Sequence, residues 1–238
     1  MTEFNAIRSR ARDDLVIITE SGGEDVFLWE HSERVARWAR QIARFPAIQE
    51  KAPSEEALIV AALYHDAGWA ARVRDGETDR LEILLRPVPD SHYERGASIM
   101  ERSLSGLVPA ATLRRAADAL RALDKRKVHL IDAQVIADAE NLEEFCPLAL
   151  WPTIRRGALE GKAVQAVVDT WHRRKEYQFW MARLNDSFRF APVRELARAR
   201  LEAYERTMAE LEQHNEGEDI AAAVASSAHD PGDALTAT

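Results

Sequence analysis

The sequence predicts an all-α protein, a helical bundle with additional C-terminal helices and a short tail. Apolar residues recur at helical spacing through successive segments, whereas no segment alternates apolar and polar residues as a half-buried strand does. Ten glycines and nine prolines in 238 residues leave room for long helices, and a hydrophobic content of 46% is enough for a sizeable core. We therefore expect one helical domain over residues 1–212 and an acidic, disordered tail over residues 213–238.

Capping residues, glycines and prolines indicate where the helices begin and end. Ser54 is a suitable N-cap, because Glu55 and Glu56 follow it in the first turn. Ser91 and Glu94 have the spacing of a capping box, which gives Glu94 a structural role. The expected helices cover residues 3–19 and 25–45, a segment after Ser54, a segment after Ser91, and residues 109–123, 131–142, 154–159, 162–184 and 193–211.

Composition limits the cellular setting and the kinds of site that the chain can hold. Cys146 is the single cysteine, which excludes a disulfide framework and a cysteine-type zinc site and fits a reducing compartment. The N-terminal residues have no apolar signal core, and no run approaches the roughly 20 apolar residues that span a bilayer. The sequence predicts a soluble cytoplasmic protein that does not enter membranes.

The net charge of −8 is unevenly distributed. Residues 215–238 contain five acidic residues and no lysine or arginine, so the remaining chain is close to neutral. A protein that binds duplex nucleic acid through its phosphates needs a basic face, and this balance argues against such a partner. It leaves room for a local basic pocket that binds a small phosphorylated substrate.

A histidine lies on the apolar stripe of the segment at residues 25–45. His31 shares this stripe with Leu28, Val35, Trp38 and Ile42. The position suits a buried, hydrogen-bonded core histidine as well as a ligand.

An apolar helix ends in an adjacent histidine and aspartate. The run Leu58-Ile59-Val60-Ala61-Ala62-Leu63-Tyr64 leads directly into His65-Asp66, and Gly68 follows. An imidazole and a carboxylate at a helix end can turn toward a common point and bind one divalent cation. The dipeptide alone is weak evidence, so the prediction depends on further ligands elsewhere in the chain.

Two more polar residues occur in positions that a purely structural role does not explain well. Asp138 is in the middle of the largely apolar segment at 131–142, and aspartate is seldom buried without a partner. His92 is in the first turn of the helix after Ser91, close to Gly96-Ala97, where a neighbouring helix can approach closely. Solvent exposure is the ordinary alternative for both residues.

The order His31, His65-Asp66, Asp138 resembles the signature of the HD superfamily of metal-dependent phosphohydrolases, which is carried on an all-helical bundle. The local contexts are similar as well, and the likeness covers residues 25–145. A weaker likeness toward residue 212 is to an uncharacterised bacterial branch of predicted hydrolases. The segments that carry the main likeness are His31-Ser32-Glu33-Arg34-Val35-Ala36, Ala62-Leu63-Tyr64-His65-Asp66-Ala67-Gly68 and Ile136-Ala137-Asp138-Ala139-Glu140-Asn141-Leu142. The weaker likeness is carried by Trp180-Met181-Ala182-Arg183-Leu184 and Glu195-Leu196-Ala197-Arg198-Ala199-Arg200.

The resemblance implies one divalent cation per chain, held by His31, His65, Asp66 and Asp138. Two nitrogens and two carboxylates suit Mn, Fe, Co, Ni or Zn better than Mg or Ca. The implied reaction is hydrolysis of a phosphate mono- or diester, a nucleotide among the candidates, by a metal-activated water that Asp66 orients. His92 is the candidate acid for the leaving group.

Three basic residues are candidates for binding the phosphate of the substrate. Arg34 lies one turn beyond His31 on nearly the same face of its helix. Lys125 and Arg126 belong to a basic run directly before the segment that contains Asp138. Runs of this kind are usually solvated, so this role is the minority interpretation.

Departures from the family pattern leave two other functions open. Dinuclear members have two further histidines; His92 resembles the first, but Leu123-Asp124 stands near the second. Some mononuclear nucleotidases have a glutamate where this chain has Trp69. A dinuclear iron oxygenase on the same fold, with His92 and Asp124 as extra ligands, is one alternative. A metal-binding regulatory module without turnover is the other.

Overall fold

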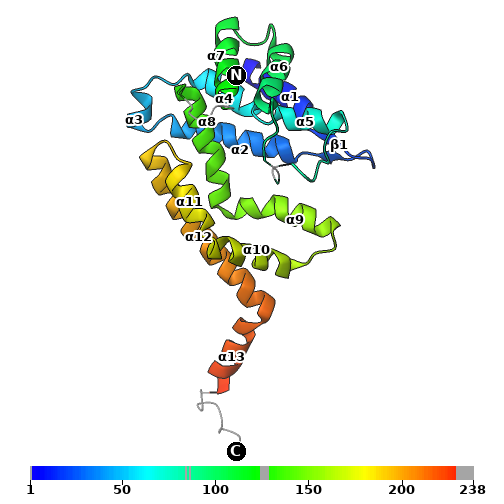
Figure 1. Ribbon diagram of the computed structural model, residues 1–238, viewed down its shortest axis with the longest axis vertical. Coiled ribbons are helices and arrows are strands. Elements are labelled where there is room, and N and C mark those ends of the chain that lie inside the picture. Colours follow the sequence, from blue (N-terminus) through cyan, green and yellow to red (C-terminus); the bar gives the residue numbers. More distant parts are fainter. Residues whose placement is uncertain (1, 84, 86, 124–128, 229–238) are drawn as a thin grey trace, which may run out of the picture.

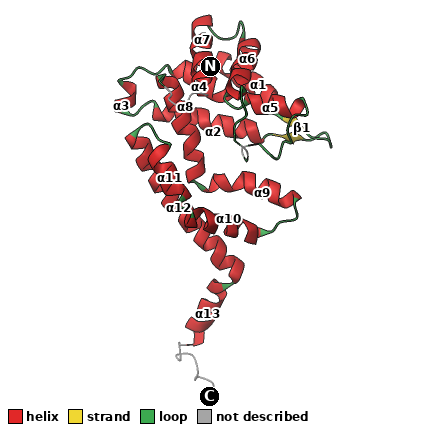
Figure 2. Cartoon of the chain, in the orientation of Figure 1, coloured by secondary structure: helices red, strands yellow, loops and turns green. Residues whose placement is uncertain are grey.

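The protein is helical along almost its whole length, which confirms the predicted all-α class (Figures 1 and 2). The computed structural model describes residues 2–83, 85, 87–123 and 129–228. No helix among them is long and apolar enough to cross a membrane. The helices are α1 (Thr2–Leu15), α2 (Phe27–Ile42), α3 (Pro46–Gln49), α4 (Glu55–Tyr64), α5 (Ala67–Arg74), α6 (His92–Leu104), α7 (Ala110–Leu123), α8 (Ile131–Asn141), α9 (Leu150–Leu159), α10 (Val164–Glu176), α11 (Phe179–Asp186), α12 (Ala191–Glu216) and α13 (Glu218–Ala228), with 3-10 turns η1 (Leu142–Phe145) and η2 (Pro147–Ala149).

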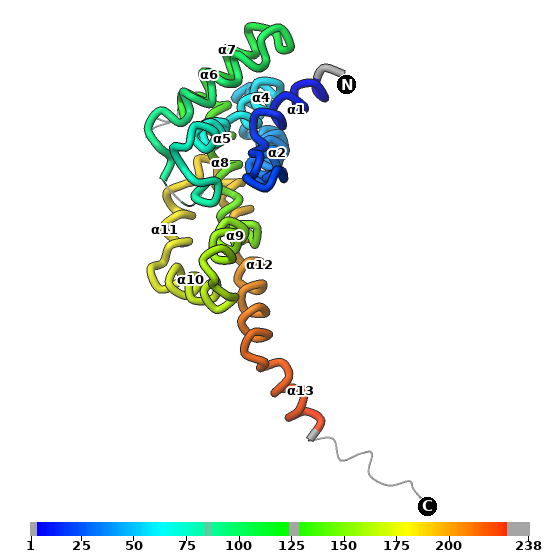
Figure 3. The backbone as a smooth tube through the Cα atoms, turned by 90° about the vertical axis from the view of Figure 1, so that its right-hand side faces the viewer, coloured from blue at the N-terminus to red at the C-terminus, as the bar shows by residue number. Residues whose placement is uncertain are grey.

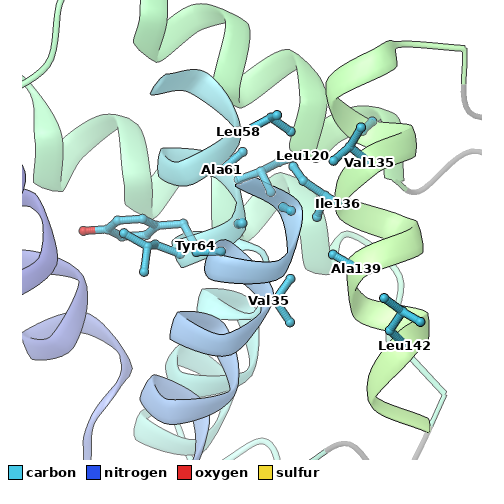
Figure 4. Close-up of a cluster of buried hydrophobic side chains, with 14 of the residues drawn as sticks. Val35, Leu58, Ala61, Tyr64, Leu120, Val135, Ile136, Ala139 and Leu142 are labelled. Atoms are coloured by element: carbon cyan, nitrogen blue, oxygen red, sulfur yellow. The ribbon is translucent and has the colours of Figure 1, made fainter. Parts of the chain in front are cut away.

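The core forms where α2, α4, α7 and α8 pack together (Figure 4). The helix α4 is buried on nearly all sides, because α2, α6, α7 and α8 surround it. Small residues such as Ala61 and Ala139 let the helices approach, and larger side chains such as Val35, Leu58 and Leu120 fill the space between them. This packing fixes the ends of α4 and α8, which carry the candidate site.

A short antiparallel ribbon, which the sequence did not predict, joins α1 to α2. It pairs β1 (Ile17–Ile18) with β2 (Glu24–Asp25), so that Ile17 is opposite Asp25. The connecting turn uses Gly22 at a positive φ of 79°, where glycine is favoured. Strands of two residues are too short to show an alternating pattern in a sequence.

The two predicted N-caps had different outcomes. The Ser54 hydroxyl accepts a hydrogen bond from the Ala57 amide at 3.3 Å, which confirms that cap. The capping box at Ser91 is wrong, because Ser91 has a φ of 59° and its side chain makes no capping bond. Glu94 instead accepts hydrogen bonds from Arg121 of α7. The ion pair with Arg121 links α6 to α7 rather than closing the start of α6.

The C-terminal helices form a second layer against the end of α8. The predicted helix over residues 162–184 is broken at Gln178, which has a φ of 52° and separates α10 from α11. The break brings Trp171, Trp180 and Tyr204 together, with ring centroids 4.4 Å and 4.7 Å from Trp171. These aromatic side chains fix α10 and α11 on α12.

The predicted disordered tail is helical as far as the structure describes it. The helix α12 continues to Glu216, and α13 follows Gly217, whose φ of 72° ends α12. The side chains of residues 218–227 are exposed, and Figure 3 shows this part of the chain projecting from the body. Residues 229–238 of the predicted tail lie outside the described residues.

Candidate metal centre

The break between α4 and α5 places His65 and Asp66 side by side. His65 is the C-cap of α4, and Asp66, with a φ of −105°, is the N-cap of α5. His31 reaches them from α2, which packs directly on α4. All three side chains are buried, with exposures of 3% for His31, 0% for His65 and 1% for Asp66.

The three side chains direct one donor atom each toward a common point. The Nε2 atom of His31 lies 3.2 Å from Nε2 of His65 and 3.3 Å from Oδ2 of Asp66. Nε2 of His65 lies 3.5 Å from the same Asp66 oxygen. Donor atoms about 2.1 Å from one cation, at angles of about 90 to 110°, lie about 3.0 to 3.4 Å apart. Among the described residues, these three form a group whose geometry could hold a metal ion.

Hydrogen bonds on the far side of each ring leave the Nε2 lone pairs facing each other. His65 donates from Nδ1 to the Ala62 carbonyl at 2.7 Å, and His31 donates from Nδ1 to Glu143 at 2.9 Å. Oδ2 of Asp66 is buried and has no hydrogen-bond partner. Three electron-rich atoms in contact require a positive charge between them, so the donor set fits a divalent transition metal.

The pKa shifts of His31 and Asp66 also indicate a site for positive charge. Burial lowers the pKa of His31, but the charge of Glu143 and the bonds to Asp66 and Glu143 outweigh it and raise the pKa to about 10. Burial raises the pKa of Asp66, but His65, His31 and His92 hold it well below its ordinary value. The site therefore stabilises positive charge, as a proton or as a metal ion.

Glu143, which sequence reasoning missed, orients His31. Its two carboxylate oxygens accept from His31 Nδ1 and, at 2.7 Å, from Arg34. The predicted phosphate-binding residue Arg34 therefore lies beside the site with its guanidinium on Glu143. The sequence does not reveal this role, because Glu143 lies in a run of acidic residues after the apolar part of α8 and resembles a surface residue.

The structure does not bring Asp138 into the group. Asp138 is fully buried, but its oxygens accept from the amides of Arg189 at 3.0 Å and Phe190 at 3.1 Å, and from the Arg189 side chain. These bonds hold the chain that enters α12. The partners that this buried aspartate needs are here the backbone N–H groups just before α12.

A different acidic residue of α8 lies near the group. Burial raises the pKa of Glu140, and its carboxyl interacts electrostatically with His65, Asp66, His31 and His92. Two residues correspond to about 200° of helix rotation, so Glu140 and Asp138 face nearly opposite sides of α8. Glu140 was not among the predicted ligands, because the sequence does not show which side of α8 faces α2.

His92 is inside the site rather than on the surface. It is fully buried, and Nε2 donates to the His65 carbonyl at 3.1 Å and faces Asp66 Oδ1 at 3.2 Å. Two glycines permit this packing. A Cβ on Gly68 would lie 2.6 Å from the His92 carbonyl oxygen, and one on Gly96 would lie 2.9 Å from that of Tyr64. The expected close approach of α6 at Gly96 is thus confirmed.

The remaining predicted residues are not placed at the site. Lys125, Arg126 and Asp124 lie outside the described residues. His31, His65 and Asp66 come together as a possible metal-binding group, with His92 and Arg34 next to them.

Comparisons with known proteins show the fold and the family of the chain. Among solved structures, the chain is similar to Bacillus subtilis YpgQ, with 18% identity, a TM-score of 0.55, and coverage of 90% of this chain and 97% of that one. YpgQ in complex with ADP matches with 20% identity and the same TM-score and coverage. The Lin1889 protein of Listeria innocua matches with 11% identity, a TM-score of 0.52, and coverage of 91% and 98%.

At these identities the structural likeness shows the fold alone. No curated protein matches the chain. The sequence model of the HD domain matches residues 28–144, a range that contains His31, His65, Asp66, His92 and Glu140. The chain belongs to the HD superfamily, and residues 28–144 are its HD domain.

Proposed function

We propose that the protein is a metal-dependent hydrolase of a phosphate mono- or diester, with nucleotides among the candidate substrates. The observation that carries this proposal is the convergence of two histidine lone pairs and the unpartnered Asp66 oxygen at one buried point. The ADP bound to YpgQ, a protein of the same fold, supports a phosphorylated small molecule as the ligand.

In this proposal His31, His65 and Asp66 hold one Mn, Fe, Co, Ni or Zn ion. Glu140 replaces the predicted Asp138 as the candidate fourth donor, because the Asp138 oxygens are bonded to the amides of Arg189 and Phe190, whereas Glu140 is on the side of α8 near the histidines. When bound, the cation would polarise a phosphoryl oxygen and lower the pKa of a water molecule. Glu143 fixes the ring of His31, and the Ala62 carbonyl fixes that of His65.

The protein residues supply orientation and a proton. Asp66 is the candidate to orient the attacking water, since its carboxylate lies between the histidines and His92. His92, whose Nε2 lies 3.2 Å from Asp66 Oδ1, is the candidate proton donor to the leaving-group oxygen, in its imidazolium form. The buried Trp69 packs beside His92, with ring centroids 5.4 Å apart.

An activity screen tests the proposal. Wild-type protein, loaded in turn with each of the five metals, is assayed against phosphomonoesters, phosphodiesters and nucleotides, with His65→Ala as the control. Turnover that needs metal and is lost in His65→Ala supports a hydrolase. Metal binding without turnover on any ester would favour the regulatory module, and two irons per chain would favour the oxygenase.

A further inference from the structure

Two arginines beyond the proposed metal ligands converge on one carboxylate at the start of the HD domain. Asp25, in β2, accepts a hydrogen bond from Arg80 Nη1 at 2.9 Å, and the same oxygen accepts from Arg155 of α9. Asp25 and Arg155 are largely buried, with side-chain exposures of 9% and 13%. The cluster therefore joins β2, the loop after α5, and a helix that lies outside the HD domain.

The cluster has one more positive charge than negative charge. Asp25 is the one carboxylate that Arg80 or Arg155 contacts in the part of the chain that the structure describes. Glu82, which is nearby in sequence, pairs with Arg156. The largely buried Arg155 therefore shares its one carboxylate with the more exposed Arg80, an arrangement that favours a second anion at the cluster.

One hydrogen-bond donor of the cluster lacks a partner. The Nη1 atom of Arg155 is buried without an acceptor, although Nη2 of the same guanidinium is bonded to Asp25. A buried N–H group without an acceptor is rare and costly, and it indicates a missing ligand or water. Arginine presents its donors as a planar fork that matches phosphate oxygens.

The guanidinium of Arg155 packs on the ring of Phe27, which lies one turn of α2 before His31. Its Cζ atom is 4.2 Å from the centroid of the Phe27 ring, and α9 is below α2 in Figure 1. Phe27 precedes His31 by one helical turn, about 6 Å along the axis, and both are buried on the same face of α2.

We propose that Arg155 and Arg80 form an anion subsite that binds a second phosphate group, one turn of α2 away from the group held at the metal centre. The substrates would be compounds with two or more linked phosphates, such as nucleoside diphosphates. This inference rests on the proposed function. It also explains why Arg34, whose guanidinium is on Glu143, need not bind the substrate.

Binding of ADP and AMP, measured by calorimetry on metal-loaded protein, tests the subsite. Arg155→Gln and Arg80→Gln should each weaken ADP binding about 10- to 100-fold, the usual worth of a hydrogen bond to a charged group. AMP binding and metal content should change little, because AMP has no second phosphate. Arg156→Gln is the matched control, since Arg156 is the neighbouring residue and is already paired with Glu82 and Glu160.

Asp25→Asn gives an independent test, in which ADP binding should become tighter instead of weaker. The amide oxygen can still accept from the Phe27 amide, as Oδ1 of Asp25 does at 3.1 Å, but the charge that competes with the substrate is gone. ADP should therefore bind more tightly than to the wild type. Because Arg80 is more exposed than Arg155, Arg80→Gln keeps the test decisive if Arg155→Gln does not fold.

The results separate this inference from the proposed function. Loss of ADP binding in Arg155→Gln or Arg80→Gln without hydrolysis of any ester would support the subsite and contradict the hydrolase. Hydrolysis in the wild type with unchanged ADP binding in both variants would contradict the subsite alone. Equal weakening of AMP and ADP, or a wild type that does not bind ADP, would also overturn it.

Discussion

In His31 and His65, a hydrogen-bond acceptor next to one ring nitrogen determines which nitrogen can bind a metal ion. Each ring donates its Nδ1 proton to an oxygen, so each Nε2 is left as a lone pair. The family resemblance predicted His31, His65 and Asp66 as ligands, and in the sequence His31 lies on an apolar stripe and His65-Asp66 ends an apolar helix. Glu140 and Glu143 could not be predicted, since their role depends on how α8 is rotated against α2.

The rotation of α8 gives a prediction that compares two acidic residues. Glu140→Gln should weaken metal binding at least about tenfold, because a carboxylate donor is replaced by an amide. Asp138→Asn should keep the metal but lower the free energy of unfolding by about 1 to 3 kcal/mol, because the amide nitrogen faces the N–H groups of Arg189 and Phe190. Elemental analysis and denaturant unfolding measure the two effects, and the reverse pattern would restore Asp138 as the ligand.

The role of His92 is tested by separating proton transfer from metal binding. If His92 is the acid, His92→Gln should retain the metal and lower turnover by about 10²- to 10⁴-fold. The pH–rate profile should also lose one ionisation. Unchanged turnover would leave His92 with the task of orienting Asp66, and loss of a second metal equivalent would make it a ligand.

At the scale of elements, the sequence predicts the helices better than their ends. The apolar stripes of α2, α7, α8 and α12 were found because each runs over several turns. The ribbon of β1 and β2, the break at Gln178 and the failed cap at Ser91 all depend on a few residues. Tertiary contacts decide such local conformations, as the ion pair of Glu94 with Arg121 does at the start of α6.

The approach of α6 to the end of α4 gives a prediction for two glycines. Gly96→Ala should lower the free energy of unfolding by about 1 to 3 kcal/mol, because its Cβ would be 2.9 Å from the Tyr64 carbonyl oxygen. Gly157→Ala is the control within α9, where the nearest atom is 3.6 Å away, and it should stabilise by up to about 1 kcal/mol. Thermal unfolding measures both; a harmless Gly96→Ala would mean that α6 can move away from the site.

At the scale of the whole molecule, the C-terminal helices complete the HD domain. Asp138 binds the chain at the start of α12, and Arg155 of α9 contacts Phe27 of α2. The family resemblance predicted the helical domain and, as candidate ligands, the three residues His31, His65 and Asp66 that the structure brings together. The dependence of the domain on α9 and α12 became visible only in the structure, because it rests on contacts between residues more than 50 positions apart in the chain.

The projecting C-terminal segment should contribute little to stability. Deletion of residues 215–238 should leave the melting temperature nearly unchanged, because the described side chains of α13 are exposed. Deletion from residue 191 should unfold the C-terminal layer, because it removes the buried Tyr204 and Met208. A drop of several degrees after the shorter deletion would show that α13 packs against the body or against another copy.

The central claim is that His31, His65 and Asp66 form a metal centre, and metal titration of the chelator-treated protein tests it most directly. The account predicts that Mn²⁺ or Zn²⁺ binds with one equivalent per chain in the wild type. Binding should be lost in His31→Ala, His65→Ala and Asp66→Ala, while each variant keeps its helical circular dichroism spectrum. Wild-type stoichiometry and affinity in any two of these variants would contradict the account.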